Sequence, residues 1–251
     1  MLIKILLLDI ETAPNIVFSW GLWQQNIGIN QIVDAGYALC WAAKWLGSDK
    51  IEFASVFHNT KKNMLKKIHK MLDDADVVVH YNGKRFDIPT LNKEFIKVGL
   101  LPPSPYKQVD LLSVARRQFK FASNKLDYVA RFLGLGEKVK HRGMDLWRDC
   151  MERVPEAWEE MRGYNIQDVI LLEKVYNVLL PWIGSTNPNR NVFEGTRLSC
   201  PSCGSHNVQR RGTSRSKTLI YQRFACTDCG SWSRSNKAEP RDNKQPLYVP
   251  L

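Results

Sequence analysis

Apolar residues in the first two thirds of the chain form short runs that alternate with longer amphipathic stretches. Residues 2–8 are almost continuously apolar, which is typical of a strand buried on both faces. Further strands are predicted at 36–43, 51–57 and 76–81. Helical patterns cover 61–73, 87–98, 109–119, 125–133 and a long stretch from about 155 to 180. Strands that precede helices in this order predict an α/β fold.

Two domains are expected from the length and from a break in this pattern. A chain of 251 residues can form one sizeable core and a small second module. Residues 184–196 are rich in turn formers, so we predict a linker there, after a first domain at 1–183. A small module is predicted at 197–236, and the polar residues 237–251 are expected to form a flexible tail.

The charge of the chain is distributed unevenly. The composition, 44% hydrophobic and 24% charged, is that of a globular protein. The net charge is +11: residues 186–251 hold 11 Lys and Arg against 4 Asp and Glu, whereas residues 1–185 hold 25 against 21. A basic excess favours polyanionic partners such as nucleic acid, with solubility alone or an anionic membrane surface as alternative interpretations.

The N-terminal run is interrupted by Asp9 and does not read as a targeting segment. No run approaches the roughly 18 to 20 apolar residues of a membrane span. We therefore expect a cytoplasmic protein without a membrane partner, and leave open a phage-encoded protein that acts in the cytoplasm of its host.

Four of the six cysteines are concentrated in the C-terminal module. Cys200 and Cys203 form one C-x-x-C pair, and Cys226 and Cys229 form a second pair after 22 intervening residues. Two such pairs are typical of a zinc ribbon with one structural Zn²⁺, whereas a redox dithiol competes as the interpretation of a single pair. His206 is an alternative ligand that the site does not need.

Basic and aromatic side chains are interleaved in the same module. The stretch 218–225 alternates as a strand does. The side chains in question are Arg210, Arg211, Arg215, Lys217, Arg223, Arg234, Tyr221, Phe224 and Trp232. This combination favours nucleic acid as the ligand, with charge for solubility or docking of a protein as alternatives.

Acidic residues follow two of the predicted strands. The first strand ends in Asp9 and Glu11, and alternation along a strand places both carboxylates on one side, where like charges require a cation. Asp87 lies after a polar turn that contains Asn82. Taken alone, Asp87 is more readily interpreted as a helix N-cap and Asn82 as a turn residue.

Tyr164 and Asp168 lie four positions apart on the last predicted helix and therefore share one face. In order, D-x-E, N-x-x-x-F-D and Y-x-x-x-D resemble the three motifs of the DEDD family of 3′-to-5′ exonucleases, over about residues 3–180. The histidine variant of the family would need His at Gly163, so the chain resembles the DEDDy branch, and stand-alone microbial or phage exonucleases more than a polymerase.

The resemblance implies a ribonuclease-H-like mixed sheet flanked by helices and a two-metal mechanism. Hard oxygen ligands fit two Mg²⁺ or Mn²⁺ ions. By resemblance, Asp9 would bridge both ions, Glu11 and Asp168 would complete one site, and Asp87 would hold the second ion. Tyr164 would position the attacking water, because a phenol with a pKa near 10 is a poor base at neutral pH.

Several further residues are candidates for contact with substrate. Thr12, Asn82 and Phe86 are expected near the terminal nucleotides, with a structural role as the alternative. Three aromatic residues, Phe18, Trp20 and Trp23, follow the first motif, and we favour a place in the core over a surface that stacks bases.

The sequence thus predicts a 3′-to-5′ exonuclease that releases nucleoside monophosphates, acts on DNA in preference to RNA, and binds single-stranded 3′ ends. The alternatives are a structure-specific endonuclease on the same fold and an inactive nucleic-acid-binding adaptor. A replication or repair protein is left open as a partner.

Overall fold

The chain divides into two compact units, which are described separately. The computed structural model describes residues 3–184, 198–216 and 218–240. The first unit spans Lys4–Asn177, and the second contains the C-terminal strands. The predicted linker beyond residue 184 and most of the predicted tail lie outside the described residues. Within the described part, no helix has the length and apolar character needed to cross a membrane.

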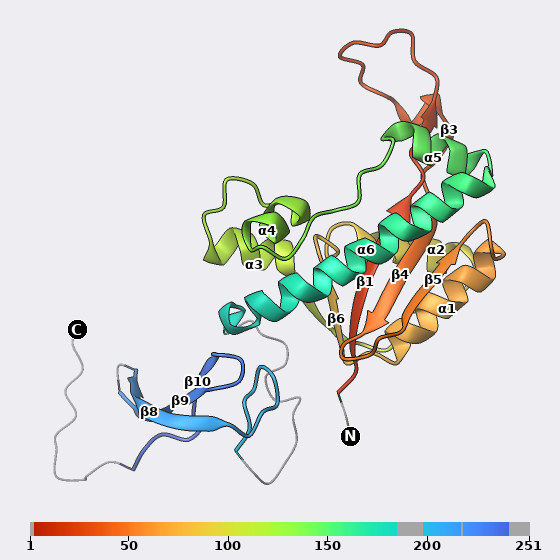
Figure 1. Ribbon diagram of the computed structural model, residues 1–251. Coiled ribbons are helices and arrows are strands. Elements are labelled where there is room, and N and C mark those ends of the chain that lie inside the picture. Colours follow the sequence, from red (N-terminus) through yellow and green to blue (C-terminus); the bar gives the residue numbers. More distant parts are fainter. Residues whose placement is uncertain (1–2, 185–197, 217, 241–251) are drawn as a thin grey trace. The chain divides into compact units, whose positions relative to one another are not determined.

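A five-stranded mixed sheet forms the centre of the first unit (Figure 1). In spatial order its strands are β5 (Ile51–Ser55), β4 (Ala38–Trp45), β1 (Ile5–Thr12), β6 (Val77–His80) and β7 (Lys107–Asp110). The central strand β1 is antiparallel to β4 and parallel to β6. The apolar runs that predicted β1 and β6 are buried, as expected for strands that are covered on both faces.

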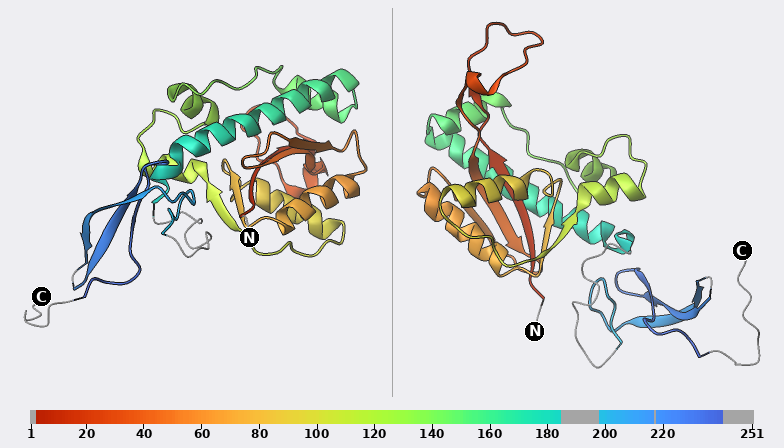
Figure 2. Two further views of the ribbon diagram at one scale, coloured as in Figure 1. Left: turned by 60° about the horizontal axis from the view of Figure 1, so that its bottom comes forward. Right: turned by 180° about the vertical axis from the view of Figure 1, so that it is seen from behind.

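Helices cover both faces of this sheet (Figure 2). In chain order they are α1 (Lys61–Asp73), α2 (Asp87–Lys97), α3 (Leu111–Gln118), α4 (Leu126–Phe132), α5 (Met144–Met151) and α6 (Pro155–Leu179). Leu6, Leu8 and Ile10 of β1 pack in one core cluster with α1 and α2. Residues of β4, including Leu39 and Cys40, pack in a second cluster with α5 and α6. The expected α/β architecture is confirmed.

The same alternation fixes where the acidic residues of β1 point. Because Leu8 and Ile10 face α1 and α2, Asp9 and Glu11 face α6. β1 continues to Thr12, one residue beyond the end that the sequence analysis predicted, so both acidic residues lie in the C-terminal half of the strand. The strand geometry therefore holds the two carboxylates rigidly side by side.

The sequence prediction was wrong at one helix start and missed several elements. Val109 and Asp110 belong to β7, and the Asp110 carboxylate caps α3 by accepting the backbone N–H groups of Leu112 and Ser113. The missed elements include α5, the strands β2 (Ile16–Val17) and β3 (Ile32–Asp34), and two short 3₁₀ turns, Ile29–Gln31 and Leu180–Trp182.

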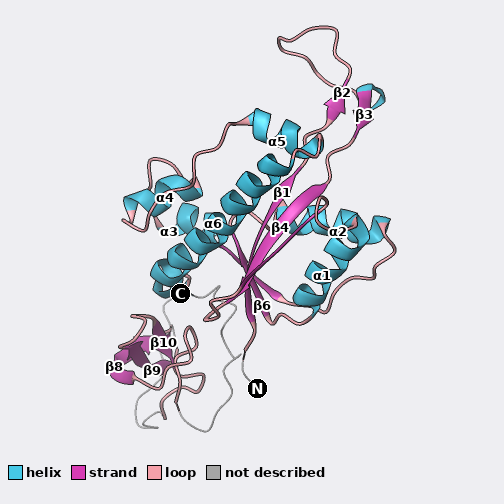
Figure 3. Cartoon of the chain, turned by 45° about the vertical axis from the view of Figure 1, so that its right-hand side comes forward, coloured by secondary structure: helices cyan, strands magenta, loops and turns pink. Residues whose placement is uncertain are grey.

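The hairpin formed by β2 and β3 extends from the end of β1 (Figure 3), and we refer to residues 16–34 as the aromatic arm. Phe18, Trp20 and Trp23 in this arm are 75%, 99% and 82% exposed. The expectation that these aromatic side chains belong to the core is therefore wrong. Their use as a stacking surface stays a prediction.

The C-terminal unit contains an antiparallel sheet of three strands in the order β10-β9-β8. Their bounds are β8 (Val208–Arg215), β9 (Ile220–Cys226) and β10 (Trp232–Arg234). β9 corresponds to the strand predicted at 218–225, whereas β8 and β10 were not predicted. Among the described residues of this sheet, Phe224 is the one large apolar side chain that is buried. The apolar core of the C-terminal unit is therefore small.

The turn between β6 and α2 depends on Gly83. A Cβ atom at this position would lie 2.4 Å from Cγ of the buried His80, whose ring accepts the Gly83 N–H at 3.1 Å. We expect Gly83→Ala to lower the free energy of unfolding by about 1–3 kcal/mol, since the crowded ring must move. Urea denaturation measures this change.

Gly163→Ala is the matched control for that substitution. Gly163 is exposed within α6, and a Cβ atom added there would meet open space. Alanine at this position should raise the free energy of unfolding by about 0.5–1 kcal/mol. Equal stability of the two variants would contradict the role assigned to Gly83.

Candidate active site

Carboxylates from β1 and α6 meet at the centre of the first unit. Asp9, Glu11 and Asp168 each place one ligand oxygen within 4.8 Å of the others. Asp87 is joined to the same strand, because the Ile10 N–H donates to its Oδ1 at 3.2 Å. The N-cap of α2 is Phe86, so the interpretation of Asp87 as a plain cap is wrong. The fold brings together the four acidic residues of the motifs.

Burial and mutual repulsion make these carboxylates hard to ionise. Burial, followed by the charges of Glu11, Asp87 and Asp168, raises the pKa of Asp9 well above its usual range. Burial and the charge of Asp168 raise the pKa of Glu11 to about 8. Burial raises the pKa of Asp87 to about 7, although two backbone N–H groups oppose this shift. A cation is needed to keep all four ionised near neutral pH.

Lys138 supplies one positive charge to the cluster. Its ammonium donates to Asp168 Oδ2 and, at 3.1 Å, to the Tyr164 hydroxyl. Burial lowers the pKa of Lys138, but the charges and hydrogen bonds of Asp168 and Tyr164 together outweigh this effect and raise the pKa above its usual value. No motif in the sequence indicated Lys138, because it lies in the segment between α4 and α5 and only the fold brings it here.

Asn165 is a second contact that the motifs do not include. Its fully buried side-chain amide donates to Asp9 Oδ2 at 2.7 Å, and the Cys40 thiol lies 3.8 Å from its Oδ1. This hydrogen bond fixes the orientation of the Asp9 carboxylate. A polar residue on the inward face of α6, next to Tyr164, was the signal that could have identified it.

Tyr164 is held by two neighbouring rings. His141 and Trp147 contact it edge-on, with ring centroids 4.9 Å and 6.1 Å away. Burial and the charge of Asp168 raise the pKa of Tyr164 to about 12. The hydroxyl is therefore protonated at neutral pH and can orient a neighbouring polar group without acting as a base.

The donor set fits a hard divalent cation. All four candidate ligands offer carboxylate oxygens, which are the donors that Mg²⁺ and Mn²⁺ prefer. Asp168 Oδ1 is buried, and no hydrogen-bond partner for it is found in the described part of the chain. A metal ion would satisfy this oxygen.

The predicted substrate contacts are close to the acidic motif residues in the sequence. Thr12 ends β1, one residue beyond Glu11. Asn82 adopts a positive φ of 71°, and its backbone N–H donates to Asp110 Oδ1 at 3.0 Å. Phe86 leaves 43% of its surface exposed. Contact of these residues with nucleotides stays a prediction.

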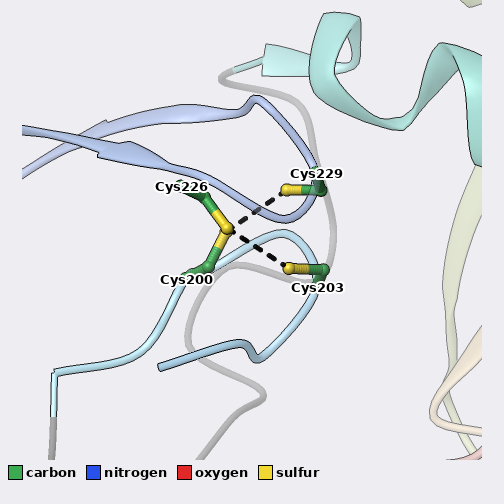
Figure 4. A group of neighbouring side chains, drawn as sticks. All are labelled: Cys200, Cys203, Cys226 and Cys229. Atoms are coloured by element: carbon green, nitrogen blue, oxygen red, sulfur yellow. Dashed lines mark hydrogen bonds between the residues drawn. The ribbon is translucent and has the colours of Figure 1, made fainter. Parts of the chain in front are cut away.

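The four cysteines of the C-terminal unit form a second candidate metal site (Figure 4). Their Sγ atoms all lie within 4.8 Å of one another, and the Cys200–Cys229 and Cys203–Cys226 pairs are both 3.7 Å apart. A tetrahedron with Zn–S bonds of about 2.3 Å has edges of about 3.8 Å. The geometry is therefore compatible with a zinc ribbon. His206 contacts the Leu198 carbonyl and is not part of this cluster.

Comparison with known proteins agrees with the fold. The family model described as RNase_H superfamily matches residues 6–180. The structure is similar to that of the family B DNA polymerase from the hyperthermophilic archaeon Pyrobaculum calidifontis, with a TM-score of 0.55 and 16% sequence identity. This similarity covers 78% of the chain and 26% of the polymerase. No curated protein matches the chain. At this identity the likeness concerns the fold alone.

The raised pKa values predict an unusual pH dependence of stability in metal-free protein. The folded-state pKa values of Glu11 and Asp87, about 8 and about 7, exceed those of an unfolded chain, about 4.3 and 3.9. The folded protein then binds more protons than the unfolded chain between these values. We expect the free energy of unfolding in chelator to fall as pH rises from about 5 to about 8.

Urea denaturation across this pH range measures the effect, and excess Mn²⁺ should reduce the decline. Glu11→Gln removes one of the shifted groups and should flatten the profile, whereas Asp49→Asn, at an exposed bend, should leave it unchanged. A wild-type profile that rises with pH, or equals that of Glu11→Gln, would contradict the prediction.

Removal of zinc should affect the C-terminal unit alone. Because the described strands bury little apolar surface, we expect chelation to abolish the folding of this unit while the first unit stays folded. Metal analysis should find one zinc per chain in wild type and none in Cys203→Ser/Cys229→Ser. Limited proteolysis beyond residue 198 reports the loss, and resistance of the zinc-free protein would contradict a structural role.

Proposed function

The chain belongs to the RNase_H superfamily, and from that premise we propose that it is a divalent-metal-dependent 3′-to-5′ exonuclease of the DEDDy branch. Membership of this superfamily supports nuclease activity in general. The proposed reaction hydrolyses nucleic acid, DNA in preference to RNA, to nucleoside monophosphates. The observation that carries the proposal is the convergence of Asp9, Glu11 and Asp168, with Asp87 bonded to the backbone between the first two.

Hydrolysis of a phosphodiester needs neutralisation of the phosphate, an activated water and support for the leaving oxygen. Two Mg²⁺ or Mn²⁺ ions, when bound, would supply these three effects. Within this chain, Asp9, Glu11, Asp87 and Asp168 would hold the ions. The hydrogen bond from Asn165 orients Asp9, and Tyr164 would orient the water that attacks the phosphorus atom.

Lys138 has a place in the same proposal. Its ammonium bonds to Asp168 and Tyr164, and thus lies where negative charge would be greatest in a complex with a phosphate. A positive charge beside the scissile group would stabilise the charge that develops in the transition state. Thr12, Asn82 and Phe86 would contact the terminal nucleotides.

The C-terminal zinc ribbon would assist binding of nucleic acid. Arg223 lies over the ring of Trp232 at 4.8 Å, and Arg234 over the ring of Tyr221 at 4.0 Å. Because Arg234 pairs with Arg223 in the sheet, these side chains share one face, opposite to that of Phe224. Paired guanidinium groups and rings are suited to phosphates and unpaired bases.

Labelled single strands test the proposed activity. With Mg²⁺, wild type should release mononucleotides from the 3′ end, while Asp9→Asn and Asp168→Asn should be inactive and fail to bind Mn²⁺. The exposed Asp49→Asn serves as the control that keeps both properties. Internal cleavage would indicate an endonuclease, and tight binding without turnover would indicate an adaptor; either result overturns the proposal.

Tyr164→Phe tests whether the Tyr164 hydroxyl orients the attacking water or also removes a proton from it. Loss of one oriented hydroxyl should lower kcat about tenfold and leave measurable activity. Rates from rapid-quench kinetics give this value. An unchanged kcat would remove Tyr164 from the mechanism, and complete loss would indicate a larger role than orientation.

A further inference from the structure

Two cavities adjoin one another beside the acidic cluster. The first, of about 570 Å³, is lined by Asp9 and Lys138 together with residues of the segment from Ser123 to Asp127. The second, of about 390 Å³, is lined by the turn after β6 and the start of α3. Both cavities are lined by Leu112 and Arg116, so they form a continuous concave surface that starts at Asp9.

Basic side chains dominate the lining of this surface. They are Lys84, Arg85, Arg116, Arg117, Lys125 and Lys138. The acidic side chains of the lining are Asp9, Asp110 and Asp127. Apart from the end of the surface at Asp9, the charge offered to a ligand is therefore positive.

Two of these acidic groups are already occupied within the protein. Asp110 is buried, and its Oδ1 accepts the backbone N–H groups of Asn82, Leu112 and Ser113. Asp127 pairs with Arg131 at 2.8 Å, and its other oxygen accepts the backbone N–H of Lys138. Among the described residues, neither carboxylate forms an ion pair with a basic side chain of the surface.

Lys84, Arg85, Arg116 and Lys125 are among the five exposed basic residues of the lining. No ion pair to any of these four is found among the residues that the structure describes. Exposed, unneutralised Lys and Arg along a concave path form the electrostatic footprint of a polyanion-binding site.

We propose that this surface, the basic track, holds the phosphodiester backbone of a single strand, upstream of the nucleotide that lies at Asp9. Cavities of this volume accommodate a ligand of the size of one nucleotide, which fits an unpaired strand better than a duplex. The direction in which the strand lies rests on the proposed function. A 3′ end at Asp9 places the upstream phosphates near Arg116 and Lys84. The binding of a single strand itself does not depend on catalysis.

The test compares Lys84→Gln/Arg116→Gln with a charge-matched control, Lys62→Gln/Lys66→Gln, on the exposed face of α1. Binding of a long single-stranded oligonucleotide is measured by fluorescence anisotropy in Ca²⁺ at several salt concentrations. The Lys84→Gln/Arg116→Gln protein should bind about tenfold more weakly, and its log Kd against log salt should lose about 1.4 in slope, since each phosphate contact contributes about 0.7 for single strands. The control should match wild type.

Hydrolysis of a short and a long substrate distinguishes an effect on the basic track from an effect on the acidic cluster. The p-nitrophenyl ester of thymidine 5′-monophosphate has no phosphate upstream of the nucleotide at Asp9, so the track variant should retain its hydrolysis, while its KM for the long strand rises about tenfold. Wild-type affinity and salt slope in the track variant would overturn the inference, as would competition by polyglutamate as strong as that by the oligonucleotide. Wild-type protein that hydrolyses neither substrate would overturn the proposed function, and the anisotropy measurement would still decide on the track.

Arg85→Gln provides a second variant. It should also bind the oligonucleotide more weakly, and the slope of its log Kd against log salt should change by half as much as in the double variant. Near-ultraviolet circular dichroism identifies any variant that has lost its fold. A folded Arg85→Gln protein with full affinity and unchanged salt slope would count against the extension of the track beyond Arg116.

Discussion

The gathering of four like-charged groups in one place, two of them buried and two half-buried, is the constraint on which the rest of the structure depends. Asp9, Glu11, Asp87 and Asp168 repel one another and lose hydration, so each prefers its neutral form unless positive charge or hydrogen-bond donors are present. The fold provides some compensation through Lys138, Asn165 and the backbone of Ile10. The remaining repulsion makes the cluster suited to a divalent cation, which would offset the repulsion that the protein alone leaves in place.

The architecture meets this constraint with rigid elements. β1 is paired antiparallel with β4 on one side and parallel with β6 on the other. Alternation along the strand then fixes which of its residues face α1 and α2 and which face α6. α6 crosses the same face and presents Tyr164, Asn165 and Asp168 toward the strand. The apolar side chains of β1 face α1 and α2. A shift of the strand register by one residue would therefore move Leu8 and Ile10 into the charged cluster. The hydrophobic core thereby protects the geometry of the polar site.

The sequence predicted those features that depend on local pattern. The apolar runs of β1 and β6 were readable because both faces are buried, and the four acidic residues were readable because they stand in three ordered motifs that resemble those of the DEDD exonucleases. Lys138 was not readable, since it belongs to none of these motifs and only the fold brings it to Asp168. β8 was missed because its eight residues contain few apolar side chains, and strand pairing there is supported by the cysteine cluster instead of a hydrophobic face. The burial of Phe18, Trp20 and Trp23 was wrongly expected, because composition alone does not show that a hairpin leaves the sheet.

The aromatic arm has a consequence for how such a domain can diversify. It leaves β1 immediately after the acidic residues and returns to β4, and its own pairing is confined to β2 and β3. Its length and side chains can therefore change by insertion, deletion or substitution with little effect on strand register or on the carboxylate cluster. The arm is thus an exchangeable segment that carries large exposed apolar rings, and it can vary while the strand register that positions the carboxylates stays the same.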